Sequence, residues 1–293
     1  MQGVARDMAD HQGLAQARAA LDRRGSAHTL PPGINLRPLT LAASLTGEML
    51  SPEDTGHGVL LYFHGGGYCT GSAASCRPLC AALAQSTGRA VLAPDYRLAP
   101  EAPYPAALDD ALASYAWLLL QGYAAADIAV AGDSAGGGLA LAMLLAIRAD
   151  RHGQRLPMPR AAVGICPWLD LACTSNSYQA NAASDPLAGA DALRLLGKAY
   201  AGEHRLQDPL LSPHYAQELA GLCPLLLQVG SAETLLDEVL HFANIAQQSA
   251  VPVLCQQWQN MTHVWHSFGE LLPEANQALQ VIADWLEGYD HQS

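Results

Sequence analysis

Short, almost wholly apolar runs recur along the chain, and most are followed by a turn and a longer stretch with helical character. Apolar runs of four to eight residues bounded by turn residues indicate strands. The predicted strands lie over residues 59–63, 90–93, 128–130, 161–166, 225–229 and 253–258, with two less regular ones within 34–50. Helices are predicted over 75–86 and 106–120. The order of these elements indicates an α/β fold.

Two regions depart from this alternation. Residues 1–24 have a weak apolar side, which predicts a helix that ends at Gly25 and rests on something larger. Residues 171–223 show no continuous strand pattern, and one helix is predicted in them near residues 190–200. A connection of this length inside a domain usually carries a lid or a binding element.

The strand at 128–130 opens the segment IAVAGDSAGGG at residues 128–138, and an all-round apolar helix follows at once. Gly132 and Gly136 lie two residues on either side of Ser134, which fits the G-x-S-x-G nucleophile elbow. There the backbone tolerates no bulk, and the serine hydroxyl is held above the sheet. The N–H of Ala135 would start the helix, where partial positive charge stabilises an oxyanion. A glycine-rich turn without catalytic function is the alternative.

The charge balance excludes some classes of protein. The 293 residues carry 27 acidic and 15 basic side chains, a net charge of −12, so no nucleic-acid partner is expected. Apolar runs are too short to span a bilayer, and residues 1–24 lack a signal-peptide pattern, so no membrane partner is expected.

Seven scattered cysteines favour free thiols and a cytoplasmic location. Cys76 and Cys80 share a helix face without further ligands at zinc-finger spacing, so no metal is expected.

The strand at 59–63 leads into His64-Gly65-Gly66-Gly67-Tyr68. Consecutive glycines let bare backbone N–H groups approach a bound oxygen closely. This loop complements the elbow, because an oxyanion hole of the hydrolase type combines the N–H after the nucleophile with N–H groups of an HGGG loop. Gly66, Gly67 and Ala135 are therefore the candidate oxyanion-hole donors.

Three motifs follow one another in the order HGGGY, DYRLAPE with PYPAALDDA, and GDSAGG. In this combination the chain resembles the bacterial hormone-sensitive-lipase-like (family IV) carboxylesterases of the α/β-hydrolase superfamily. The resemblance implies a mostly parallel eight-stranded sheet flanked by helices, with a helical cap. Residues 1–50 would supply the N-terminal cap helix and leading strands. Residues 51–293 would form the catalytic domain, with a cap insertion at about 171–223.

A serine hydroxyl needs a base to remove its proton, and the base needs a carboxylate to orient it. His263 follows the last strand and matches the M-x-H-x-W pattern of the family, so it is the expected base, with His266 as the alternative. The order of serine, acid and histidine is that of α/β-hydrolases.

Three carboxylates are candidates for the acid. Glu233 stands where many relatives carry Asp in a D-P-L-x-D-E segment, here E-T-L-L-D-E, and it is the expected acid. Asp237, inside the following helix, and Asp170, after the preceding strand, are the alternatives. Arg97, Glu101 and Asp133 are interpreted as charges that brace the loops. Tyr68, Trp168 and Trp265 are candidates for the pocket lining or for the core.

The resemblance implies a serine carboxylesterase that hydrolyses short- to medium-chain esters through an acyl-serine, without a cofactor. The family also includes non-catalytic binding proteins, such as the plant gibberellin receptor, in which the catalytic histidine is replaced. Retention of Ser134, His263 and an acid favours an enzyme. Amide or lactone hydrolysis remains an alternative reaction. C-terminal helices and edge strands are compatible with a homodimer.

Overall fold

A computed structural model describes residues 11–290, apart from 55, 57 and 186–188. Its eight strands form one sheet in the order β1-β2-β4-β3-β5-β6-β7-β8. The strands are β1 (Ile34–Ala42), β2 (Leu45–Pro52), β3 (Val59–Phe63), β4 (Ala90–Pro94), β5 (Ile128–Asp133), β6 (Ala161–Ile165), β7 (Leu225–Gly230) and β8 (Val253–Trp258). Strands β3 to β8 are parallel, while β1 and β2 pair antiparallel. The prediction of a mostly parallel eight-stranded α/β-hydrolase sheet is confirmed.

The helices are α2 (His11–Ser26), α3 (Ala73–Thr87), α4 (Ala106–Leu120), α5 (Ala135–Arg148), α6 (Ser177–Ala180), α7 (Ala190–Ala201), α8 (Leu236–Gln248) and α9 (Pro273–Asp290). Short 3₁₀ turns lie at Ala125–Asp127, Pro213–Tyr215 and Trp265–Leu271. Helix α3 begins two residues before its predicted start, because the Ser72 hydroxyl accepts a hydrogen bond from the N–H of Ser75 and caps the helix there. No specific prediction covered α9.

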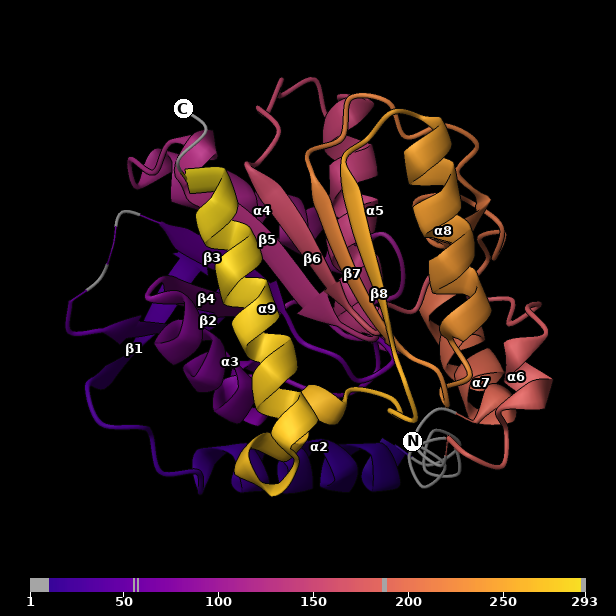
Figure 1. The fold of residues 1–293 in the computed structure, drawn as a ribbon, viewed down its shortest axis with the longest axis horizontal. Helices are drawn as coiled ribbons and strands as arrows, with labels where there is room; N and C mark the ends of the chain where they lie inside the picture. Colours follow the sequence, from indigo (N-terminus) through magenta and orange to yellow (C-terminus); the bar gives the residue numbers. More distant parts are fainter. Residues whose placement is uncertain (1–10, 55, 57, 186–188, 291–293) are drawn as a thin grey trace.

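The two faces of the sheet bury separate apolar clusters. Along β3, Leu60 and Tyr62 point into the cluster formed with α3 and α9, whereas Leu61 and Phe63 point into the cluster formed with α4, α5 and α8. This alternation follows from the two-residue period of a strand. All five β3 side chains are buried, because helices cover both faces of the sheet (Figure 1).

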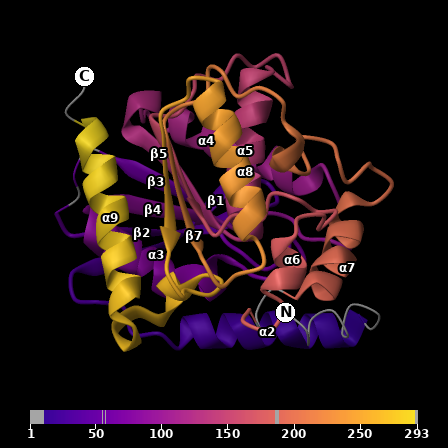
Figure 2. The same ribbon diagram turned by 45° about the vertical axis from the view of Figure 1, so that its right-hand side comes forward.

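Helices α2, α6 and α7 lie across the end of the sheet where the parallel strands finish (Figures 1 and 2). The side chain of Arg18 in α2 binds the adjacent loops: its Nε donates to the carbonyl of Cys69 across 2.8 Å, and its Nη2 donates to that of Ala99 across 2.9 Å. Arg18 also pairs with Glu101 at 2.8 Å. Helix α2 is therefore fixed to the loops that follow β3 and β4.

Among the described residues, no helix combines the length and the apolar character needed to cross a bilayer.

Candidate active site

The turn between β5 and α5 holds Ser134 in a strained backbone conformation with φ +52° and ψ −122°. A Cβ at Gly132 would lie 2.3 Å from the carbonyl oxygen of Gly136. A Cβ at Gly136 would lie 2.0 Å from the carbonyl oxygen of Phe63. Both distances are shorter than a Cβ permits. Glycine at 132 therefore lets the first turn of α5 lie against the end of β5, and glycine at 136 lets that turn pack against the end of β3.

The structure brings Ser134, His263 and Glu233 together at this end of the sheet. Nε2 of His263 lies 2.9 Å from Oγ of Ser134, and Nδ1 lies 2.8 Å from Oε2 of Glu233. All three side chains are buried, and Glu233 is fully so. The second carboxylate oxygen of Glu233 accepts a hydrogen bond from the N–H of Gly230. This chain of contacts can carry a proton from the hydroxyl to the imidazole and hold the charged ring.

The other candidates for the acid and the base have hydrogen-bond partners outside this group of three residues. Asp237 accepts a hydrogen bond from the N–H of Ser177 across 2.9 Å. Asp170 accepts bonds from the N–H groups of Ala172 and Thr174 and so shapes its own turn. Nε2 of His266 lies 2.8 Å from the side-chain oxygen of Gln228. Burial and the neighbouring charge of His263 lower the pKa of His266 to about 3.

The environment of His263 favours its charged form. Burial alone would lower the pKa of the ring, but the hydrogen bond and the negative charge of Glu233 outweigh it, and the carboxylates of Asp185 and Asp133 add to this effect. The net result is a pKa above the ordinary histidine value. The carboxylates thus stabilise the imidazolium that proton transfer would create.

Asp133, the residue before the elbow serine, anchors the glycine loop. Its Oδ1 accepts a hydrogen bond from the N–H of Gly65 across 2.9 Å and another from the hydroxyl of Tyr62 across 2.6 Å. Gly66 has φ +122°, and a Cβ there would lie 2.2 Å from the carbonyl oxygen of Thr70. Only glycine fits this turn, which places the loop beside the N-terminus of α5.

The bracing role predicted for three charged residues agrees with the contacts. Besides Asp133, Arg97 pairs with Asp110 through two guanidinium nitrogens, and Glu101 pairs with Arg18. Tyr68, Trp168 and Trp265 are all buried. Tyr68 stacks on Tyr200 of α7 with the ring centroids 3.7 Å apart.

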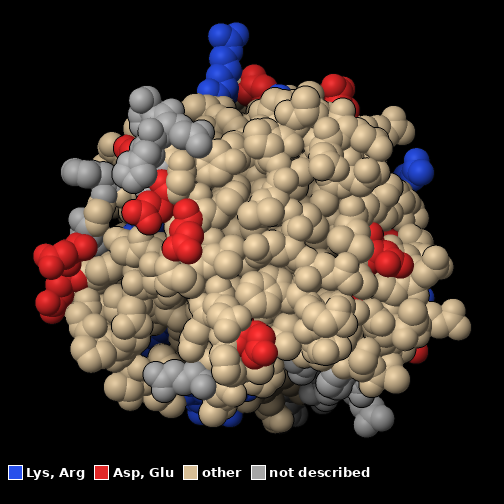
Figure 3. Space-filling model, in the orientation of Figure 1, with Lys and Arg blue, Asp and Glu red and all other residues tan. Residues whose placement is uncertain are grey.

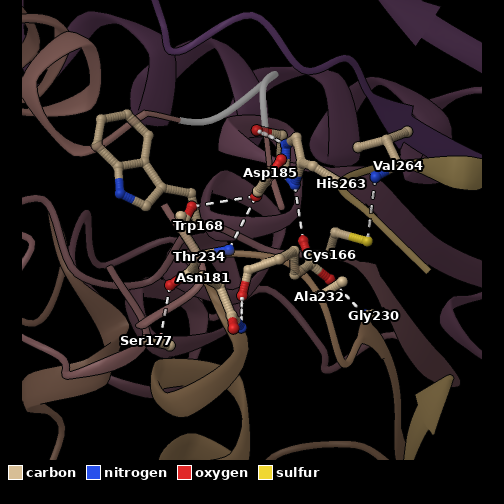
Figure 4. Close-up of polar contacts among 12 residues, drawn as sticks. Cys166, Trp168, Ser177, Asn181, Asp185, Gly230, Ala232, Thr234, His263 and Val264 are labelled. Carbon is tan, nitrogen blue, oxygen red and sulfur yellow. Dashed lines mark hydrogen bonds and ion pairs between the residues drawn. The ribbon is translucent and has the colours of Figure 1, made fainter. Parts of the chain in front are cut away.

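Cys166, one of the seven scattered cysteines and without a role predicted from the sequence, lies beside the histidine and the acid. Its sulfur accepts a hydrogen bond from the N–H of Val264 across 3.3 Å (Figure 4). Cys166, Glu233 and His263 each offer a ligand atom, all within 4.8 Å of one another. The facing atoms of Glu233 and His263 are 2.8 Å apart, however, whereas ligands of a tetrahedral zinc ion stand about 3.4 Å apart. This spacing fits a shared proton and leaves the three residues as a hydrogen-bonded group.

A strained serine on a strand-turn-helix elbow, bonded to a histidine that is bonded to a carboxylate, defines a serine hydrolase of the α/β-hydrolase fold. Residues 60–267 match the family model described as the alpha/beta hydrolase fold, and the chain belongs to this family, within its bacterial hormone-sensitive-lipase branch of esterases.

Individual relatives support this assignment. An acetyl-hydrolase from Streptomyces hygroscopicus is 40% identical over 92% of this chain and 88% of its own length. An ethyl acetate hydrolase from Pseudomonas putida is 36% identical over 78% of this chain and 72% of its own. The crystal structure of an esterase from the bacterial hormone-sensitive lipase family superposes with a TM-score of 0.89 at 37% identity, covering 94% of this chain and 92% of that one. The chain is a carboxylic ester hydrolase.

Proposed function

We propose that Ser134 is the nucleophile, His263 the general base and Glu233 the acid of a carboxylesterase that forms an acyl-serine. The observation that carries this assignment is the unbroken contact path from Oγ of Ser134 through the imidazole of His263 to the carboxylate of Glu233. In the first step Nε2 of His263 takes the hydroxyl proton while Oγ attacks the ester carbonyl carbon. The imidazolium then gives the proton to the leaving alcohol. Water repeats the sequence, releases the acid and restores the serine.

The negative oxygen that forms in each attack requires hydrogen-bond donors. We assign these to the N–H groups of Gly66, Gly67 and Ala135. The first N–H groups of an α-helix have no partner within the helix, so that of Ala135 is free to bind an anion. The loss of one such donor typically costs about 3 kcal/mol of transition-state stabilisation.

We propose esters with short to medium acyl chains as substrates. The relatives named as an acetyl-hydrolase and as an ethyl acetate hydrolase support the short end of this range. The test measures hydrolysis of p-nitrophenyl esters from acetate to laurate, and of matched anilides and lactones, with the native chain and with Ser134→Ala. We expect turnover of acetate to octanoate esters and at least a thousandfold loss in Ser134→Ala. Equal turnover by both proteins would refute the assignment of the nucleophile.

We further propose that α2 and residues 171–223 form a cap over this site, with the leading strands in residues 1–50 and the catalytic domain in 51–293. The position of α2, α6 and α7 across the ends of the parallel strands supports this division (Figure 2). Limited proteolysis with and without a phosphonate bound to Ser134 tests it. We expect cleavage within 171–223 to slow when the site is filled.

A homodimer and a cytoplasmic location complete the proposal. Strand β8 is the last strand of the sheet, and Leu254 on it is 41% exposed, which suits pairing with a second copy. Leu254→Lys should yield monomers in light scattering, whereas Leu120→Lys, at an exposed residue on α4, should leave the mass unchanged. The free thiols of all seven cysteines suit a reducing compartment, which cell fractionation tests.

Nucleic acid is not proposed as a partner. The net charge is −12, and the face drawn in Figure 3 carries scattered acidic groups and few basic ones. A polyanion binds where Lys and Arg are concentrated. Gel-shift titration at low salt should show no complex.

A further inference from the structure

Residues 177–185, which comprise α6 and the turn after it, lie against residues 231–237, which are the loop that carries Glu233 and the first two residues of α8. We call residues 177–185 the α6 segment and residues 231–237 the acid loop. Figure 4 shows Ser177, Asn181 and Asp185 of the α6 segment around Ala232 and Thr234 of the acid loop. The two stretches are about fifty residues apart in the sequence, and their contact is made by polar side chains on main-chain groups.

The carbonyl groups of the acid loop accept hydrogen bonds from the α6 segment. Nδ2 of Asn181 donates to the carbonyl of Glu233 across 2.8 Å and to that of Ser231 across 3.2 Å. Oγ of Ser184 donates to the carbonyl of Ala232 across 2.9 Å. Three successive carbonyls, including that of Glu233 itself, are therefore bonded to two side chains of the α6 segment.

Two buried side chains extend this contact to the next residues. Oγ of Ser177 donates to the carbonyl of Thr234 across 2.6 Å, and it accepts from the N–H of Asp237 across 3.2 Å. Oδ2 of Asp185 accepts from the N–H of Thr234 across 2.8 Å. Ser177 is 3% exposed and Asp185 is 1% exposed, so water does not readily replace these bonds.

The opposite side of the acid loop binds the strand and loop that lead to His263. The N–H of Ser231 donates to the carbonyl of Trp258 across 2.8 Å, and that of Ala232 donates to the carbonyl of Met261 across 3.1 Å. By contrast, the hydrogen bonds inside the acid loop, from Glu233 N to Gly230 O and from Leu236 N to Glu233 O, are 3.4 Å long. Apart from the hydrogen bond that the carboxylate of Glu233 accepts from the N–H of Gly230, the loop is thus held more closely by the histidine side and the α6 segment than by its own main-chain hydrogen bonds.

We propose that the α6 segment is a positioning element for Glu233, so that the part of the chain covering the site also sets the geometry of the catalytic acid. This inference rests on the proposed roles of Ser134, His263 and Glu233. When the α6 segment leaves its place, the acid loop loses the partners of four carbonyls and two N–H groups, and the carboxylate loses its fixed distance to the imidazole. A displacement near 1 Å at a catalytic group lowers a rate by about a hundredfold.

Asn181 provides the first test. Asn181→Ala removes both donated bonds, and Asn181→Asp keeps the size while it places a carboxylate against two carbonyl oxygens. We expect kcat to fall about tenfold or more in both variants, by the same factor for acetate and hexanoate esters, with KM within twofold. A cap residue that contacts substrate would instead change KM and discriminate between the two acyl chains.

Gln179 supplies the matched control, because it lies in the same α6 segment with an exposed side chain. Gln179→Ala should retain the native kcat and unfolding temperature. The proposal is overturned if Asn181→Ala, folded by the same criterion, keeps kcat within twofold of the native enzyme. If Asn181→Ala unfolds, the decision passes to Ser184→Ala, which removes the bond to Ala232 from an exposed position, with the same criterion.

Two variants of Asp185 distinguish the effect of its hydrogen bond to Thr234 from the effect of its charge. Asp185→Asn retains an oxygen that can accept from the N–H of Thr234, whereas Asp185→Ala does not. We expect Asp185→Ala to lose about tenfold in kcat and Asp185→Asn to lose clearly less, because both variants remove the charge that raises the pKa of His263 but only Asn keeps the acceptor for Thr234. Equal losses in the two variants would overturn the positional role of this residue.

A double-mutant cycle tests whether the effect passes through Glu233. In a Glu233→Gln background, Asn181→Ala should lower kcat by less than twofold, because the group that it positions is already disabled. Multiplicative losses would overturn the proposal. If Ser134→Ala remained active, the proposed function itself would fail. If turnover is lost in Ser134→Ala but unchanged in Asn181→Ala, only the positioning role of the α6 segment fails.

Discussion

Oε2 of Glu233 lies 2.8 Å from Nδ1 of His263, while the other oxygen of the same carboxylate accepts a hydrogen bond from the N–H of Gly230. The carboxylate is therefore fixed at both oxygens, one by the histidine and one by the end of β7. Because Glu233 is fully buried, solvent screens its charge little, and the imidazole feels it strongly. The first two predictions depend on this geometry.

The first prediction concerns pH. Neutral His263 is the base, and its pKa is raised above the ordinary value of about 6.5 by Glu233 against the opposing effect of burial. The acid limb of kcat/KM should therefore lie above pH 6.5. In Glu233→Gln the charge is gone and burial remains, so the limb should move to lower pH while the rate at pH 8 falls. A limb that stays in place in this variant would show that another group controls it.

The second prediction concerns the length of the acid. Glu233→Asp shortens the side chain by one methylene, so one carboxylate can no longer reach both Gly230 and His263 from the same loop. We expect kcat to fall about tenfold or more while the protein remains folded by circular dichroism. Native rates in Glu233→Asp would mean that the acid loop moves to compensate.

The third prediction concerns the glycine loop. Gly66→Ala places a methyl group 2.2 Å from the carbonyl of Thr70 at φ +122°, so the loop must shift. We expect a loss of kcat/KM of about a hundredfold, equivalent to about 3 kcal/mol. Gly33→Ala is the control, because Gly33 also has a positive φ of +79° but no atom within 4 Å of the added carbon. It should leave the rate unchanged.

The fourth prediction concerns the stability of the fold around Glu238. Its Oε1 accepts from the N–H of Leu169 across 2.6 Å, and Oε2 lies 2.7 Å from the hydroxyl of Tyr178, which also reaches the carbonyl of Asp170. Burial raises the pKa of Glu238 well above its ordinary value, so a neutral amide is a close substitute. In urea unfolding, Glu238→Ala should lose about 3 kcal/mol and Glu238→Gln less than about 1 kcal/mol. Equal losses would indicate that the charge is required.

The fifth prediction concerns the link between α2 and the loops over the site. Arg18 binds two main-chain carbonyls, at Cys69 and Ala99, as well as Glu101, whose side chain is half exposed. An exposed ion pair contributes under about 1 kcal/mol. We therefore expect Arg18→Ala to lower kcat severalfold and Glu101→Ala to lower it less, in parallel ester assays. A larger loss in Glu101→Ala would mean that the carboxylate acts on a partner other than Arg18.

Much of the fold was predictable because local sterics determine it. The run 59–63 is short, almost wholly apolar and bounded by turn residues, which is typical of a strand covered on both faces. Gly132 and Gly136 mark the elbow in the sequence because no other residue fits where two backbone segments lie this close. A Cβ added at either glycine would lie 2.0 to 2.3 Å from a main-chain oxygen. Helix α9 was not foreseen, although it completes one face of the sheet.

The sequence made Glu233 the expected acid through the family pattern but left Asp237 and Asp170 as alternatives, since all three follow strands at the same end of the sheet. Which carboxylate reaches His263 depends on how the loops after these strands run. The carboxylate of Asp237 accepts a hydrogen bond from the N–H of Ser177, and that of Asp170 accepts one from the N–H of Thr174 in the turn that follows it. Cys166 next to the triad was likewise not foreseen, because its neighbours Val264 and Glu233 come from two other strand ends.

The sequence by itself therefore determined the order of strands and helices, the elbow and the glycine loop, since each depends on contacts within a few residues or on whether a Cβ fits. Only the tertiary structure decided which carboxylate meets the imidazole and that the α6 segment holds the acid loop. Those contacts join residues 30 to 60 positions apart, and their formation depends on how independent loops pack at the end of the sheet.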